Sequence, residues 1–307
     1  MKDKKIIFMG TPNIAAQHLQ ALIDNNLNIV GVYTQPPRKK NRGMKLRESE
    51  VGIIAKKNNL KIFYPTIFKE KELNDIKILN PDLIIVVAFG IILPEFLLNI
   101  PKFGCLNVHV SLLPRWRGAT PIEHALLFGD TQTGVSIIKL SSKLDAGDIL
   151  IQEKIKIEET VYRDELTQKL SDLGKKLIIK VLPEIFNKNI FPIKQDEKKI
   201  TYAPKINSDE RKIDFNRECS NVLNHIRAHG PSPGSWFIYN GERIKILKAI
   251  KKNTEGQKST ILNKQFLLGC KEGSILPILI QREGKKITTL DNFLRGFNFK
   301  VNDQLNV

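Results

Sequence analysis

The stretch KIIFMGTP, residues 5–12, opens the chain with a run of apolar side chains that stops at Gly10. Such a run predicts a buried strand, and a proline just after the turn suits the first turn of a helix. Residues 13–25 place apolar side chains at helical spacing, and residues 29–33 are apolar again. A strand, a helix and a second strand in this order predict a parallel sheet covered by helices.

The alternation of strands and helices continues through the first two thirds of the chain. We expect helices over 51–58, 121–128 and about 160–182, and strands over 82–87, 104–111, 135–140 and 149–157. After residue 187 the periodicity weakens and prolines recur. We therefore predict an α/β domain over residues 1–189 and a linker over residues 190–208.

Residues 209–307 follow a different pattern. One expected helix, over about 216–228, precedes short apolar runs, and Asn240-Gly241 separates two of these runs. Asn-Gly between two strands is a good signal of a tight hairpin. Short strands separated by glycine-containing turns predict a small β-barrel of the OB type as a C-terminal domain over these residues.

Composition limits the class of protein. The 307 residues are 41% hydrophobic and 26% charged, which is globular usage. No apolar stretch approaches the roughly 18 residues that a membrane helix needs, and the basic start lacks the long apolar run of a secretory signal. The 3 cysteines lie far apart and suggest neither a disulfide framework nor a zinc site. We expect a cytoplasmic protein without a metal and without membrane contact.

The charge is strongly positive, because 49 Lys and Arg against 32 Asp and Glu leave +17. A lysine-rich genome would inflate the surface charge without any partner. A polyanionic partner, most often a nucleic acid, explains the excess as well, since cationic side chains neutralise phosphates. The densest cluster is residues 36–47, PPRKKNRGMKLR, with six basic residues and no acid. This segment is either a solvated loop or an RNA contact.

Residues 104–111, GCLNVHVS, carry polar side chains where a buried strand should be apolar on both faces. Alternate residues of a strand share a face, so Asn107, His109 and Ser111 should point to one side. Ligands of open α/β sheets bind at the carboxyl ends of strands, which is where this segment ends. A hydrogen-bonded core explains a lone histidine, whereas the three together favour a functional site.

A second candidate is the loop LDAGD, residues 144–148, between two expected strands. Two acids and a glycine often serve only the turn itself. The spacing alone does not decide whether Asp145 or Asp148 belongs to a site.

Together these segments resemble the tetrahydrofolate-dependent formyltransferase superfamily. The motifs that carry the resemblance are NVHVSLLPRWRGATPIEHAL from residue 107 and GVSIIKLSSKLDAGDIL from residue 134. The resemblance covers nearly the whole chain, because it includes FMGTP near the start, VVAFGIILP at residues 86–94 and FLRGF at residues 293–297. Within the superfamily, it is to the members that act on methionyl initiator tRNA. The resemblance implies a Rossmann-like N-terminal formyltransferase domain and an OB-like C-terminal domain that binds tRNA. It also implies 10-formyltetrahydrofolate as formyl donor, no metal, and methionyl initiator tRNA as acceptor.

The resemblance assigns roles to particular residues. Its catalytic positions match Asn107, His109 and Asp145. Its tetrahydrofolate-binding positions match Ser111, Leu112, Leu113 and Pro114.

The chemistry of formyl transfer agrees with these roles. Attack of an amine on a formyl carbon develops an oxyanion, which hydrogen-bond donors stabilise. The Asn107 amide and a protonated His109 are such donors. Asp145 would favour the protonated imidazole and accept the amine proton, directly or through water.

In the basic segment, residues 42–46 match the R-G-x-K-L core of the loop with which the superfamily's tRNA-specific members contact the acceptor end. The superfamily's usual Ser-Pro-rich continuation is replaced here by Arg-Glu-Ser-Glu. Arginine both pairs with phosphate and reads base edges. The residues that we expect to bind tRNA are Arg42, Lys45 and Lys40.

Two other functions would share part of this pattern. A folate formyltransferase acting on glycinamide ribonucleotide or on an amino-sugar nucleotide would have the same trio, but it would need neither the basic segment nor the added barrel. A non-enzymatic RNA-binding protein with an OB barrel would explain the charge of +17, but not the polar face of residues 107–111.

Overall fold

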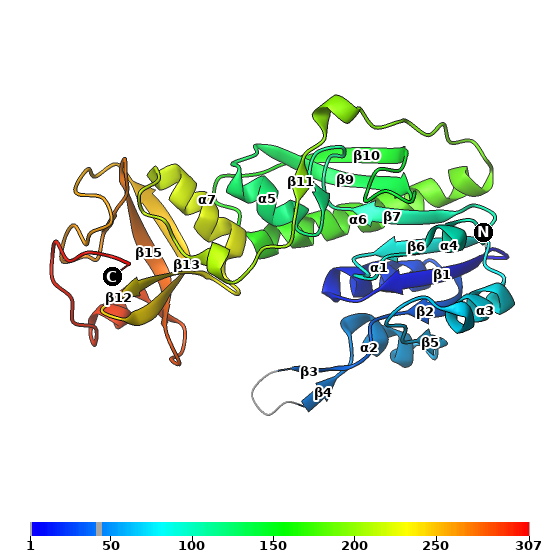
Figure 1. Ribbon diagram of the computed structural model, residues 1–307, viewed down its shortest axis with the longest axis horizontal. Helices are drawn as coiled ribbons and strands as arrows, with labels where there is room; N and C mark the ends of the chain where they lie inside the picture. Colours follow the sequence, from blue (N-terminus) through cyan, green and yellow to red (C-terminus); the bar gives the residue numbers. More distant parts are fainter. Residues whose placement is uncertain (1, 41–44, 307) are drawn as a thin grey trace. The chain divides into compact units, whose positions relative to one another are not determined.

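The computed structural model describes residues 2–40 and 45–306, and of residues 39, 40 and 45 it describes only the backbone. The chain separates into two compact units (Figure 1). Unit 1 comprises residues 1–118, 133–155 and 167–202, and unit 2 comprises residues 119–132, 156–166 and 203–307. The sequence-based division, with a linker over 190–208, stays a prediction.

Unit 1 is built on a seven-stranded sheet with the order β10-β9-β7-β6-β1-β2-β5 (Figure 1). The pairs β1–β2, β1–β6, β2–β5 and β6–β7 are parallel, which confirms the predicted Rossmann-like sheet. The pair β7–β9 is antiparallel, so the sheet is mixed at this end. The strands are β1 (Lys5–Gly10), β2 (Asn28–Tyr33), β5 (Ile62–Phe63), β6 (Leu83–Val87), β7 (Cys105–His109), β9 (Gln132–Lys139) and β10 (Ile149–Lys156).

The helices that lie wholly or mostly in unit 1 are α1 (Asn13–Asp24), α2 (Glu50–Lys57), α3 (Glu70–Leu79), α4 (Glu95–Leu98) and α6 (Arg163–Phe186). Helices α1 and α6 share one face of the sheet. A Cβ added at Gly174 of α6 would lie 2.6 Å from Nε2 of His18 in α1 and 3.1 Å from the Val108 side chain in β7. Only glycine lets the three elements approach so closely.

The opposite face of the sheet carries a second apolar layer. Ile7, Ile84 and Cys105 of the sheet pack there in one cluster with Ile76 of α3 and Leu97 of α4. The cluster places Cys105, and with it the alternate residues 107 and 109, on the face away from Gly174. The predicted alternation along this strand is therefore confirmed, although the strand ends at His109 and not at residue 111.

Three helices differ from expectation: α6 is longer than predicted, and α3 and the four-residue α4 were not predicted. Helix α6 continues three residues beyond Pro183, where the sequence predicts its end, because Phe186 packs edge-to-face on Phe103 and Ile185 is buried. Helix α3 was not expected, since Ile76 is its one buried residue. Its first turn is stabilised by a hydrogen bond from the backbone N–H of Lys69 to the Glu72 carboxylate.

The basic segment begins and ends as an antiparallel ribbon. Strands β3 (Arg38–Lys40) and β4 (Lys45–Arg47) pair in register, with Arg38 opposite Arg47 and Lys40 opposite Lys45. The ribbon follows β2 directly and stands away from the seven-stranded sheet (Figure 1).

Unit 2 combines helices with a curled antiparallel sheet of order β12-β13-β15-β14, with β16 beside β15. The register of β13 against β15 shifts near Lys248, and such bulges bend a sheet. The half-barrel that results corresponds to the expected OB-like domain. The remaining elements of the chain are β8 (Arg117–Gly118), α5 (Pro121–Leu127), β11 (Tyr202–Ala203), α7 (Cys219–His229), β12 (Ser235–Tyr239), β13 (Glu242–Lys252), β14 (Leu268–Gly269), β15 (Ser274–Arg282), β16 (Thr288–Thr289), α8 (Leu290–Leu294) and the short 3₁₀ helices Glu197–Lys199 and Asp209–Arg211.

The core of unit 2 is aromatic. Phe266 contacts the rings of Phe293, Phe297 and Phe299, and the cluster extends to Ile226 on α7. Next to it, the buried Arg227 donates hydrogen bonds to the carbonyls of residues 158 and 161 and to Asn224. This arginine ties α7 to the segment that leads into α6.

Among the described residues, no helix is long and apolar enough to cross a membrane.

The packing of α1 on α6 predicts an acid-sensitive fold. His18 is 1% exposed, its Nδ1 lies 2.8 Å from the carbonyl of Ile14, and its Nε2 has no hydrogen-bond partner among the described residues. Burial lowers the pKa of His18 to about 4. The unfolded chain binds this proton near pH 6.5, so stability is lost as the pH falls below that value.

We expect the free energy of unfolding to fall by about 2–3 kcal/mol between pH 7 and pH 4.5 through this group. In the variant His18→Leu that part of the decrease should be missing, as measured by urea unfolding at the two pH values. Equal decreases in wild type and variant would show that His18 does not carry it.

Candidate active site

Three of the predicted residues meet at the carboxyl end of β7. Asn107 and His109 lie on one face of the strand, and Asp145 arrives from the loop between β9 and β10. The Asn107 Nδ2 donates to Asp145 Oδ1 at 3.2 Å, and Asp145 Oδ2 lies 3.6 Å from His109 Nδ1. His109 is 5% exposed and Asp145 8%, while Asn107 is half-buried and reaches solvent.

The imidazole of His109 is oriented by its second nitrogen. Nε2 lies 2.9 Å from the carbonyl oxygen of Trp116. A carbonyl can only accept a hydrogen bond, so Nε2 carries a hydrogen and donates. The nitrogen that can gain or lose a proton is therefore Nδ1, which faces Asp145.

The loop that carries Asp145 is held in an uncommon conformation. Asp145 has a φ of 47°, in the left-handed region that few residues other than glycine adopt. Its Oδ2 accepts a hydrogen bond from the backbone N–H of Gly118 at 2.9 Å. Of the two acids of this loop, Asp145 is thus the one that reaches Asn107 and His109. Asp148 instead offers its backbone carbonyl to the N–H of Lys139.

Gly147 explains why the loop needs a glycine. A Cβ added there would lie 1.7 Å from the carbonyl oxygen of Lys139, which is far inside van der Waals contact. The backbone of the loop passes directly over the end of β9. The glycine permits this crossing, and the crossing turns Asp145 back towards β7.

Buried hydroxyl groups hold the segment after β7, residues 111–115, by hydrogen bonds. Ser111 is fully buried, and its hydroxyl donates to the carbonyl of Arg115 at 2.6 Å. The Ser136 hydroxyl on β9 donates to the carbonyl of Ser111 at 2.6 Å and accepts from the N–H of Leu113 at 3.1 Å. Leu113 is buried against Ile138.

Leu112, Leu113 and Pro114 line a cavity of about 610 Å³, whose other walls include Arg115, Lys194 and Lys199. Of the four residues expected to bind tetrahydrofolate, these three border free space. Ser111 uses its hydroxyl within the protein. Its hydrogen bond to the Arg115 carbonyl stabilises the conformation of residues 111–115.

The three residues expected to bind tRNA lie in or next to the ribbon. Lys40 ends β3 and Lys45 begins β4, where they are paired. Arg42 lies outside the described residues. Within the described part of the ribbon, the side chains of Arg38 and Arg47 are exposed.

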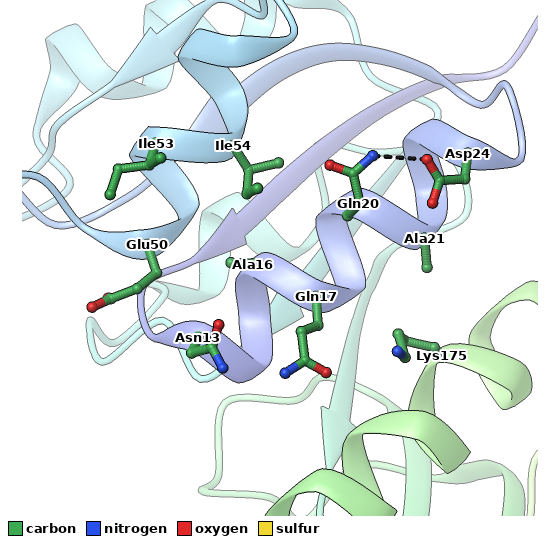
Figure 2. Close-up of a pocket in the computed structure, with 10 residues that line it drawn as sticks. All are labelled: Asn13, Ala16, Gln17, Gln20, Ala21, Asp24, Glu50, Ile53, Ile54 and Lys175. Carbon is green, nitrogen blue, oxygen red and sulfur yellow. Dashed lines mark hydrogen bonds between the residues drawn. The ribbon is translucent and has the colours of Figure 1, made fainter.

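A groove of about 470 Å³ lies elsewhere in unit 1, at α1, α2 and α6 (Figure 2). Ile53 and Ile54 of α2 line it, and Gln20 of α1 donates to Asp24 at 2.7 Å. Its ten lining residues include no imidazole, thiol or hydroxyl group and none of the predicted site residues. The groove is therefore separate from the trio at the end of β7.

Sequence reasoning missed two side chains that support the trio. Arg117 is 6% exposed and lies next to the N–H that binds Asp145. Gln195 bonds both Arg117 and the backbone of the Asp145 loop. Arg117 stood within the quoted motif, and a charged residue there was a usable signal. Gln195 lies in the weakly periodic segment, which carried no signal.

Comparison with known proteins gives a consistent result. A family model described as formyl transferase matches residues 4–182, and one described as its C-terminal domain matches residues 205–298. The methionyl-tRNA formyltransferase of Ehrlichia canis is 40% identical over 301 residues, which cover 96% of this chain and 97% of that protein. The methionyl-tRNA formyltransferase of Pseudoalteromonas translucida is 40% identical over 300 residues, which cover 95% and 94%.

A solved structure has a similar fold. The N-formyltransferase from Helicobacter canadensis, in complex with folinic acid and dTDP-3-aminofucose, has a TM-score of 0.66 at 22% identity. The match covers 91% of this chain and 99% of that one.

The crossing at Gly147 predicts a local defect on substitution. In Gly147→Ala the loop must move away from Lys139, so residues 141–148 should exchange amide hydrogen faster and the Tm should fall by several degrees. Gly296→Ala is the matched control, because a Cβ there meets nothing within 4 Å. An unchanged exchange rate of the loop in Gly147→Ala would show that the crossing does not hold it.

Proposed function

Because the chain belongs to the formyl transferase family, we propose that it transfers the formyl group of 10-formyltetrahydrofolate to the amino group of methionyl initiator tRNA. Relatives named for this reaction are 40% identical along almost their entire length. The observation that carries the proposed chemistry is the juxtaposition of Asn107, His109 and Asp145 at the end of β7.

The transfer exchanges one C–N bond for another. The neutral amine of the methionyl group attacks the formyl carbon, a new C–N bond forms, and the carbonyl oxygen becomes an oxyanion. One amide N–H of Asn107 binds Asp145, and the second is available to the oxyanion. A hydrogen on Nδ1 of His109 is the other donor on this side, because Nε2 is occupied by Trp116.

The proton balance closes within the site. The attacking nitrogen becomes positively charged and loses a proton, which the Asp145 carboxylate accepts directly or through water. The bond between the formyl carbon and N10 of the folate then breaks, and N10 receives a proton in return. His109 Nδ1, which lies 3.6 Å from Asp145, is placed to pass that proton on.

The donor fits on physical grounds beside this trio. The cavity along Leu112, Leu113 and Pro114 joins apolar walls to the cations Arg115 and Lys194, and to Lys199, which pairs with Asp196 of the same lining at 3.4 Å. Tetrahydrofolate joins a polar pterin ring and an apolar benzoyl ring to an anionic glutamate, so the apolar walls suit the benzoyl ring and the cations suit the glutamate. The exposed Leu144, next to Asp145, adds apolar surface at the catalytic loop.

The acceptor is proposed from charge and from the relatives' names. The paired strands of the basic ribbon present Arg38 and Arg47 to solvent, and the chain as a whole carries +17. Such a surface suits the phosphates of RNA. We place Arg42, Lys45 and Lys40 among the residues that contact the tRNA, and the reaction in the cytoplasm, where translation uses charged tRNA.

One experiment tests the function directly. The protein is incubated with 10-formyltetrahydrofolate and either initiator or elongator methionyl-tRNA, and formyl-methionine is measured on each. We expect formylation of the initiator species only. An amino-sugar nucleotide and glycinamide ribonucleotide serve as competing acceptors, and formylation of either in place of the tRNA would contradict the proposal.

The roles within the trio predict a selective loss of turnover. Asn107→Ala should lower kcat by about 10²–10³-fold, because one oxyanion donor is lost, with little change in the KM for folate. Asn253→Ala, an exposed position, should leave both constants unchanged. If folate affinity collapsed in Asn107→Ala while turnover stayed normal, Asn107 would be a binding residue instead.

A further inference from the structure

We propose that Gln195 is the positioning residue of Asp145, which rests on the function proposed above. Its side chain joins the Asp145 loop to the segment that binds the Asp145 carboxylate. The amide Nε2 donates to the carbonyls of Asp145 and Gly147, each at 2.7 Å. The amide oxygen accepts from Nε and Nη2 of Arg117 at 3.0 and 2.8 Å.

The surroundings of Gln195 single it out. Every residue of 191–199 other than Gln195 is exposed, and Gln195 alone turns inward. Its placement follows from an antiparallel bridge between Ile193 and Ile149, with reciprocal backbone hydrogen bonds of 2.8 and 2.9 Å. Two residues further along in opposite directions, this register sets Gln195 opposite Gly147.

Both groups that Gln195 contacts need a partner. The carbonyls of Asp145 and Gly147 belong to a loop whose backbone is strained at Asp145, with a φ of 47°. Arg117 is a nearly buried cation that pairs with no carboxylate among the described residues, and Gln195 is its side-chain acceptor. One amide thus satisfies two donors on one side and two acceptors on the other.

The two halves of this contact act on the same carboxylate. The loop half fixes the backbone from which the Asp145 side chain projects. The Arg117 half fixes the chain next to Gly118, whose N–H binds Asp145 Oδ2 at 2.9 Å. Gln195 also lines the cavity proposed for the folate, but its side-chain amide is bonded to Arg117 and to the backbone of the Asp145 loop. It sets the distance from Asp145 to His109 and Asn107.

The variant Gln195→Glu tests whether Gln195 positions the Asp145 loop or only accepts hydrogen bonds from Arg117. A glutamate keeps the acceptor for the Arg117 guanidinium and strengthens that contact with a charge. It loses the N–H donors and turns an oxygen towards the carbonyls of Asp145 and Gly147. If the only role of Gln195 were to accept hydrogen bonds from Arg117, this variant would therefore be fully active.

We expect kcat of Gln195→Glu to fall by about 100-fold, as displacement of a catalytic group by about 1 Å can cause, with the KM of both substrates within about twofold of wild type. Gln195→Met, which lacks both halves, should fall at least as far. Gln265→Glu makes the same substitution at an exposed position of unit 2 and should match wild type. A kcat for Gln195→Glu within threefold of wild type would overturn the proposal.

A second measurement does not depend on the reaction. Hydrogen–deuterium exchange of residues 141–148 should accelerate at least tenfold in Gln195→Glu, while β1 and β6 keep their protection. Unchanged exchange of this loop would refute the role of Gln195, whatever acceptor the enzyme uses. Failure of the tRNA assay with accelerated exchange would instead refute the proposed function and leave the positioning role standing.

Discussion

The placement of one buried carboxylate governs the architecture of the site. Asp145 is 8% exposed, and a charge so far removed from water must be hydrogen-bonded. Its oxygens are bound by Asn107 from β7 and by the N–H of Gly118, and they face the imidazole of His109. A loop 27 positions beyond Gly118 and 38 beyond Asn107 is thereby joined to two neighbouring segments, β7 and β8. Further contacts hold these segments: Trp116 binds His109, Gly147 lets the loop cross β9, and Gln195 joins the loop to Arg117.

The sequence predicted the fold where local patterns and tertiary packing agree. The apolar runs of β1, β2 and β6 and the Asn-Gly turn before β13 required no knowledge of distant partners. Helix α3 was missed because its single buried residue, Ile76, leaves almost no periodic signal. The end of α6 was placed too early because Pro183 outweighed a contact that only the fold creates, that of Phe186 with Phe103.

The site shows the same division between local and distant information. The alternation of residues 104–111 placed Asn107 and His109 on one face, and the choice between Asp145 and Asp148 had to come from a resemblance. Coordinates decide it through Gly147, whose crossing over Lys139 turns Asp145 inward. Gln195 could not be found from the sequence, since its partners are backbone carbonyls some 50 positions away. The type of a residue does not predict hydrogen bonds to such distant backbone groups.

The topology places the basic ribbon and the proposed catalytic trio at the same edge of the sheet. In a parallel sheet the carboxyl ends of all strands lie along one edge. Strand β2 leads directly into β3 at that edge, and β7, two strands beyond β1 on the other side, ends there with His109. A ribbon inserted after β2 therefore emerges on the side of the sheet where the chemistry is assembled. The function that we propose uses this arrangement, with the phosphates of the tRNA on the cations of the ribbon and the methionyl end at the trio. The parallel strand order thus puts the ribbon and the trio at the same edge of the sheet.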